Sequence, residues 1–213
     1  MGEMTAAVWA AMPIALAAPG GWATAAIVRI YAGSPARRWT LLAMAGLALL
    51  AVWSALVTPI GAVRIASLGL AWALLTLAAV DAATFRLPDP LTLPLAAVGL
   101  VLSLWLPGAP FWDHLAGAAA GYGFLAVSGW AFERLRGREG IGLGDAKLLA
   151  AAGAWLGWRP LPSVLIIACV GAFVWIGVRA LRRGRAVMAE RLPFGAPLCL
   201  AIWLVWLYGP LAT

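Results

Sequence analysis

The sequence predicts an all-α fold, a polytopic integral membrane bundle of about eight transmembrane helices. Of the 213 residues, 64% are hydrophobic and only 11% are charged, and the mean hydropathy is +0.96. This composition is far more apolar than that of an average soluble domain. Apolar windows of roughly 20 residues, the length that crosses a bilayer, recur along almost the whole chain. Since no length remains for a separate soluble domain, we expect residues 1–213 to form a single integral membrane domain.

The predicted helices are the apolar runs that lie between breakers and charges, taken in chain order. They fall near residues 5–30, 39–57, 62–80, 91–106, 113–133, 146–157, 161–180 and 194–211. The first run contains APGG and the sixth is short, so either helix could be kinked or could cross only part of the membrane. The start of the chain carries Glu3 and lacks the basic region of a cleavable signal peptide, so we expect the first helix to be retained.

Three acidic residues stand beside the predicted ends of the third, fourth and sixth helices. The third run finishes in LLTLAAVD, so Asp81 closes it. Before the fourth, LPDPLTLP places Asp89 directly ahead of Pro90 and an apolar run, which is the pattern of an N-cap followed by proline at the first helical position. The sixth run opens at Asp145, directly after the glycine-rich sequence GIGLG.

The basic residues predict the orientation of the bundle, because Lys and Arg concentrate in cytoplasmic connections. Alternate connections place thirteen of the fifteen on one side: Arg29, Arg37, Arg38, Arg86, Arg134, Arg136, Arg138, Lys147, Arg179, Arg182, Arg183, Arg185 and Arg191. Only Arg64 and Arg159 fall on the other side. This asymmetry puts both termini outside the cytoplasm and explains the net charge of +7 without nucleic acid. The loop LRRGRAVMAERL (181–192) then lies near anionic lipid.

The eight acidic residues are few enough to consider one by one. Asp81 and Asp145 stand apart because both predicted helix ends face the cytoplasmic side, so their carboxyls could meet. Taken alone, Asp145 could instead be a helix N-cap and Asp81 a water-facing helix terminus, although ionisable residues at membrane depth are often functional. The others fit helix ends, helix caps or ion pairs in loops: Glu3, Asp89, Asp113, Glu133, Glu139 and Glu190.

Two carboxyls that share a partly desolvated site cannot both ionise easily, so one pKa rises while the other falls. The ionised member can take a proton from water, and the protonated member can polarise a peptide carbonyl. Such a pair hydrolyses peptides without a covalent intermediate, and we expect neither a metal nor another cofactor. Gly142 and Gly144 would let the backbone bend and approach a substrate closely.

Other polar or reactive residues do not build an alternative catalytic site. His114 is predicted at the opposite membrane face from both aspartates and is interpreted as an interfacial residue. Cys169 and Cys199 lie in separate apolar runs without metal-binding spacing, which favours structural packing. The sequence GAAAG (117–121) is a small-xxx-small pattern typical of helix packing. Three tryptophans near segment ends fit an interfacial belt: Trp112, Trp155 and Trp158.

Three separated stretches of the chain resemble the type IV prepilin peptidases, the bacterial branch of the GxGD membrane aspartyl proteases. DAATFRLPDPLTLPL (81–95) is similar to the family's segment of Asp, six residues and Pro-Asp. GIGLGDAKLLAAAGAWLG (140–157) is similar to its GxGDxK segment, and ERLPFGAPL (190–198) to its closing Pro-Phe-Gly segment. The order and spacing of the three stretches also agree with those of the family.

The resemblance implies that Asp81 and Asp145 are catalytic and work at the cytoplasmic face of the bacterial inner membrane. Supporting roles follow at the other matching positions, which are Gly142, Gly144, Lys147, Pro88 and Asp89. The implied substrates are type IV prepilin-like or pseudopilin precursors, whose short basic leader is cut from an apolar helix. A type IV pilus, type II secretion or DNA-uptake system could be the client.

One departure from the family concerns methylation. Many members carry, after the first helix, a cytoplasmic region with paired CxxC motifs in which the new pilin N-terminus is methylated. Here only YAGSPARRW (31–39) joins the first two predicted helices, and no cysteine precedes Cys169. We therefore expect a short form without N-methyltransferase activity.

Two other functions remain open from sequence. A small proton-coupled transporter or channel could use Asp81 and Asp145 as a relay. Transporters commonly show internal repeats with interrupted helices near the membrane midplane, whereas these aspartates are predicted at helix ends and no repeat is evident. An inactive assembly protein of the same family is the other alternative. Membrane lipid is an expected partner, nucleic acid is not, and the oligomeric state is left unassigned.

Overall fold

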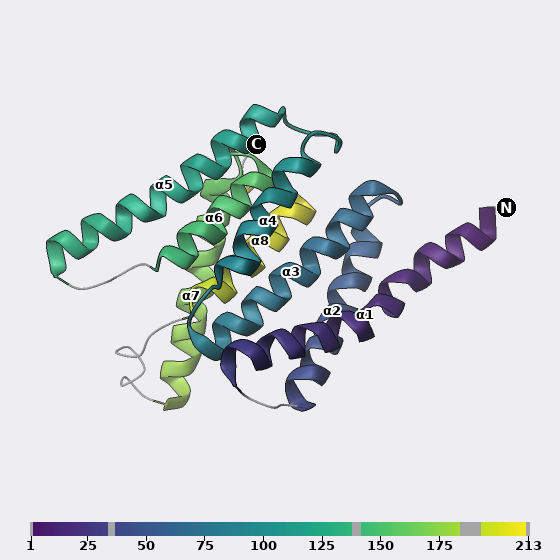
Figure 1. Cartoon of the computed structure of the whole chain (residues 1–213), viewed down its shortest axis with the longest axis horizontal. Helices are drawn as coiled ribbons and strands as arrows, with labels where there is room; N and C mark the ends of the chain where they lie inside the picture. Colours follow the sequence, from purple (N-terminus) through teal and green to yellow (C-terminus); the bar gives the residue numbers. More distant parts are fainter. Residues whose placement is uncertain (1, 34–36, 138–141, 184–192, 212–213) are drawn as a thin grey trace. The chain divides into compact units, whose positions relative to one another are not determined.

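The computed structural model describes residues 2–33, 37–137, 142–183 and 193–211, with side-chain surroundings for these ranges apart from 2–14, 16 and 37–40. Within this part the chain is all-helical (Figure 1). Its helices are α1 (Gly2–Ala32), α2 (Arg37–Val57), α3 (Ala62–Thr84), α4 (Asp89–Leu102), α5 (Phe111–Arg136), α6 (Leu143–Leu156), α7 (Leu161–Arg183) and α8 (Gly195–Tyr208). Each of the eight predicted helices is therefore confirmed, and the described residues contain no strand.

The chain divides into two compact units, Met1–Thr84 and Phe85–Thr213. The first unit contains α1, α2 and α3, which pack against one another. A buried pair of hydroxyls joins α1 to α3, with Thr24 Oγ1 2.9 Å from Thr76 Oγ1. Helix α1 runs unbroken through the APGG sequence. A single domain within the membrane stays a prediction.

Arg64, near the start of α3, is buried and closes the end of α2. Its Nη2 donates hydrogen bonds to the carbonyl oxygens of Ala55 at 2.8 Å and Thr58 at 2.6 Å. Backbone carbonyls at a helix C-terminus lack intrahelical partners and carry partial negative charge. The guanidinium therefore serves as a C-terminal cap inside the first unit.

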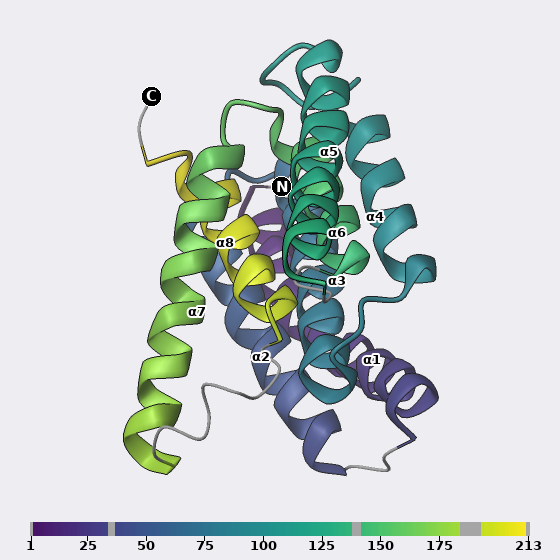
Figure 2. The same ribbon diagram turned by 90° about the vertical axis from the view of Figure 1, so that its left-hand side faces the viewer.

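Helix α6 forms the centre of the second unit, where it contacts α4, α5, α7 and α8. Figure 2 shows α7 running beside α8, and these two helices also pack together. Ala146, Leu148 and Leu149 of α6 are fully buried. The small residues of α5 allow its backbone to approach α6, since a β-carbon at Gly121 would lie 2.6 Å from the carbonyl oxygen of Leu149. The helix-packing interpretation of GAAAG is thus confirmed.

The outer surfaces of the helices are apolar, as in a protein that is solvated by lipid. In α7, Val170, Phe173 and Val174 are exposed, and in α2 so are Leu49 and Leu56. A soluble monomer would rarely expose so much apolar surface. Among the described residues, three helices are long and apolar enough to cross a membrane, namely α3, α5 and α7. The chain is a membrane protein, and the number of its helices that span the bilayer stays a prediction.

The predicted aromatic belt is wrong at one position. Trp112 and Trp158 are exposed, but Trp155 is buried in the second unit. Its Nε1 donates to the carbonyl oxygen of Leu95 at 2.8 Å, and its ring meets that of Trp206 edge to face. The packing interpretation of the cysteines likewise holds for Cys199, which is buried, whereas Cys169 is exposed.

Candidate functional site

Asp81 is a buried residue of α3. The helix continues beyond the predicted end to Thr84, so Asp81 lies about one turn inside it rather than closing it. Its exposed fraction is only 4%, which contradicts the interpretation as a water-facing helix terminus. In the same last turn, the Thr84 hydroxyl donates to the carbonyl oxygen of Val80 at 2.8 Å. Asp81 is thus a buried residue close to the C-terminal end of the first unit.

Asp145 lies in the first turn of α6, in the second unit. The N-cap of this helix is Gly142, so the interpretation of Asp145 as the N-cap is wrong. The backbone N–H groups of a first turn carry partial positive charge, which favours a carboxylate there. The side chain reaches back toward the start of the helix, since Oδ2 of Asp145 lies 3.8 Å from the place of a β-carbon at residue 142. The carboxyl is half-buried.

The two glycines before Asp145 differ in their surroundings. Gly142 has φ −71° and ψ 139°, values that any residue adopts, so the expected backbone freedom is not used there. Gly144 is already helical, and a β-carbon on it would lie 3.0 Å from Cβ of Leu87. A side chain at residue 144 would therefore press on the segment before α4.

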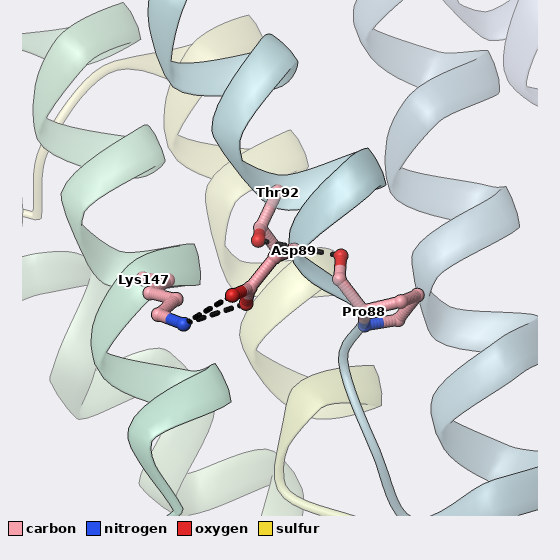
Figure 3. A network of polar contacts seen from close by, with 4 residues as sticks. All are labelled: Pro88, Asp89, Thr92 and Lys147. Atoms are coloured by element: carbon pink, nitrogen blue, oxygen red, sulfur yellow. Dashed lines mark hydrogen bonds and ion pairs between the residues drawn. The ribbon is translucent and has the colours of Figure 1, made fainter.

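Lys147 forms an ion pair with Asp89, which Figure 3 shows as a bridge between α6 and α4. The distances from Lys147 Nζ to Oδ1 and Oδ2 of Asp89 are 2.6 Å and 2.7 Å. Asp89 is the first residue of α4, one position after the N-cap Pro88. The predicted N-cap is thus wrong by one position, because Pro88 occupies it and the carboxylate binds a distant lysine instead.

The start of α4 and the connection before it contain two residues that sequence reasoning missed. Thr92 is fully buried, and its backbone N–H and hydroxyl lie 3.2 Å and 3.4 Å from the carbonyl oxygen of Pro88, to which both donate (Figure 3). Phe85 has φ 54°, in the left-handed region that bulky residues rarely adopt. This conformation costs about 1–2 kcal/mol and occurs four residues after Asp81. No sequence signal announces it, since a phenylalanine favours extended or helical backbone.

A family model described as the type IV leader peptidase family matches residues 68–177. The chain belongs to this family. The matched range contains all seven residues that were singled out from sequence, including both aspartates and the Asp89–Lys147 pair.

Curated relatives of this leader peptidase family member are named prepilin leader peptidase/N-methyltransferase. One from Burkholderia pseudomallei is 49% identical over 158 residues, which cover 74% of this chain and 50% of the relative. One from Aeromonas hydrophila is 44% identical over 167 residues, which cover 78% of this chain and 57% of the relative. One from Pseudomonas aeruginosa is 42% identical over 149 residues, which cover 70% of this chain and 51% of the relative. The chain spans about half the length of the curated relatives it matches. No solved structure matched it.

The candidate residues of this leader peptidase family member are only partly brought together. The second unit joins Gly142 to Asp145, Gly144 to Leu87, and Lys147 to Asp89. Asp81 belongs to the first unit. Most of the basic loop 181–192 and the first residues of the ERLPFGAPL segment lie outside the described residues.

His114 is far from Asp145 within the second unit. It is buried and its Nδ1 donates to the carbonyl oxygen of Ala154 at 3.1 Å, so its interpretation as an interfacial residue is wrong. Ala154 follows Asp145 by nine residues on α6, a rise of about 14 Å. His114 and Trp155 line a cavity of about 240 Å³ at this end of the unit. Among the described residues, no group of three or more His, Cys, Asp or Glu could hold a metal ion.

Proposed function

We propose that this chain is a membrane-embedded aspartic endopeptidase that removes the short basic leader from type IV prepilin-like or pseudopilin precursors. The observation that carries the proposal is the family match, which spans both Asp81 and Asp145. Relatives that are 42–49% identical bear the name prepilin leader peptidase/N-methyltransferase. These names favour a peptidase over a proton-coupled transporter. The placement of Asp145 in a helix first turn adds support, since the helix end favours its ionised form.

In the proposed reaction, water is the nucleophile and the two carboxyls exchange roles. One carboxylate accepts a proton from water while the oxygen of that water attacks the scissile carbonyl carbon. The other carboxyl gives its proton to the carbonyl oxygen, and the resulting tetrahedral intermediate collapses as a proton passes to the leaving nitrogen. Atoms and charges balance without a covalent enzyme intermediate. No residue other than Asp81 and Asp145 is assigned a proton in this scheme.

The proposal also fixes an orientation. We infer that the aspartates face the cytoplasm across the inner membrane, because thirteen of the fifteen basic residues fall in connections on that side. A basic leader followed by an apolar helix would present its junction at that surface. Anionic lipid there would attract both the leader and the arginine-rich connections.

The test is a cleavage assay with the chain reconstituted in liposomes and several prepilin-like precursors. We expect one cut at the junction between leader and apolar helix, identified by sequencing the new N-terminus. We expect mass spectrometry to show that this N-terminus is unmethylated in the presence of S-adenosylmethionine. If well-folded protein cuts none of the precursors, the proposed peptidase activity is contradicted. The alternatives would then be a proton-coupled transporter or channel, or an inactive assembly protein of the same family. A methylated product would contradict the predicted loss of the methyltransferase.

The two glycines before Asp145 provide a matched pair of variants. Gly144→Ala should lower the cleavage rate about 10-fold or more, because its methyl group presses on Leu87 and displaces the first turn of α6. Gly142→Ala should keep most of the rate, since its β-carbon meets only an ordinary contact 3.8 Å from Asp145 Oδ2. Initial rates measured on one precursor decide the matter. Equal rates for the two variants would contradict the role assigned to the contact between Gly144 and Leu87.

A further inference from the structure

The Asp89–Lys147 ion pair is a contact that the proposed proton transfers do not use. It joins two residues 58 positions apart, the first residue of α4 and a residue one turn after the start of α6. Lys147 Nζ lies within 2.7 Å of both carboxylate oxygens, and the exposed fractions of the two side chains are 25% and 52%. Isolated surface ion pairs add little stability. This one is short and engages both oxygens, and its lysine side chain is half-buried, so it can fix geometry even where its contribution to stability is small.

The position of the pair on α6 determines what it fixes. Gly144 and Lys147 are three residues apart, so they lie on one face of the helix. That face meets the segment Leu87–Asp89, because Gly144 packs on Leu87 and Lys147 binds Asp89 (Figure 3). Asp145 lies about 100° around the helix from Gly144 and about 200° from Lys147. A rotation of α6 about its axis would therefore move the Asp145 carboxyl and break the ion pair together.

We propose that Asp89 and Lys147 are positioning residues, whose ion pair holds the rotation of the first turn of α6 and so aims the carboxyl of Asp145. This inference rests on the proposed function, in which Asp145 takes part in peptide hydrolysis. The residues that follow Asp145 support such a role. Ala146, Leu148 and Leu149 are fully buried, so packing already restrains α6 directly after Asp145, and the ion pair adds a second restraint at the more exposed position 147. Hydrolysis tolerates little error in the placement of a catalytic group, and a shift of about 1 Å can cost about 100-fold in rate.

The test compares kcat and KM for charge-neutral, charge-conserving and charge-reversed variants in liposomes. We expect Asp89→Asn and Lys147→Met each to lower kcat about 10-fold to 100-fold, with KM within about twofold of wild type. Asp89→Glu and Lys147→Arg keep the charges and should recover most of kcat. The double variant Asp89→Lys with Lys147→Asp restores the pair in reverse. The two single variants for comparison are Asp89→Lys and Lys147→Asp. The kcat of the double variant should exceed that of the slower single variant about 10-fold, although the helix dipole disfavours lysine at the start of α4.

Asp113→Asn is the matched control, since Asp113 also lies in the first turn of a helix of the second unit. It should leave kcat and KM unchanged. Thermal unfolding of every variant is measured in parallel. If a neutral variant fails to fold, the kinetic comparison is made with the charge-conserving variants instead. A purely structural ion pair would lower the unfolding temperature and leave the kcat of the folded fraction unchanged, which would overturn the proposal.

Binding of the basic leader by Asp89 is the main competing role for this carboxylate. A raised KM with unchanged kcat in Asp89→Asn would show such binding, and it would overturn the positioning role. Failure of the double variant to recover any activity would overturn it as well. If wild type cuts and Asp89→Asn cuts equally fast, only the positioning role falls. If wild type itself cuts no precursor, both the proposed function and the positioning role are contradicted.

Discussion

Replacing either Asp81 or Asp145 by asparagine is expected to abolish precursor cleavage, with a loss of about 100-fold to 10,000-fold or more in rate. Asparagine preserves the shape of the side chain and its capacity for hydrogen bonds, but it cannot accept and return a proton in the cycle. Protein abundance and unfolding temperature should stay close to those of wild type. Cleavage is measured by initial rates on one precursor at matched concentrations of folded protein.

Two controls make this result specific. Asp113→Asn removes a carboxyl from the first turn of α5, as Asp145→Asn does from the first turn of α6, and it should retain full activity. Asp89→Asn should show the intermediate loss that is expected of a positioning residue. The double variant Asp81→Asn with Asp145→Asn should be no worse than either single variant, because groups that act as one unit are not additive. Undiminished turnover in either single variant would remove that aspartate from the mechanism.

The helices could be predicted because their signals are local. Apolar runs bounded by charges place each helix, whatever it packs against. A scarcity of acidic residues draws attention to any carboxyl inside an apolar run, and Asp81 proves to be buried. Close packing of α5 could also be predicted, since small residues at spacing four leave a flat helix face, but its partner α6 is known only from the structure. How many of the helices span the bilayer stays a prediction.

The errors arose where tertiary contacts decide local structure. Asp89 has an N-cap pattern, but Lys147, 58 residues away, draws its carboxylate out of any capping role. Trp155 was assigned to the interface by its position near a helix end. It is buried because Gly99 of α4 has no side chain to block the indole, and a β-carbon there would collide with the ring. Neither partner can be found from the sequence around the residue itself.

The α5–α6 contact gives the remaining large effect, because it supports the helix that carries Asp145. Gly121→Ala would place a methyl carbon 2.6 Å from the carbonyl oxygen of Leu149, one turn after Asp145. Both partners are backbone, so no flexible side chain can yield, and the helices must separate. Overpacking of this kind costs about 1–3 kcal/mol. We expect a clear fall in the unfolding temperature in detergent and a parallel loss of cleavage, as α6 moves away from α5.

Gly123→Ala is the matched control for this prediction, since Gly123 lies on the same helix and a β-carbon there meets nothing within 4 Å. Alanine is the better helix former by about 1 kcal/mol, so this variant should be at least as stable as wild type. The difference between the two variants therefore removes the intrinsic preference of glycine and alanine and leaves the contact with Leu149. If Gly121→Ala melts and cleaves like Gly123→Ala, α5 does not approach α6 as closely as described. The support of α6 would then come from α4 with its ion pair and from α7 and α8.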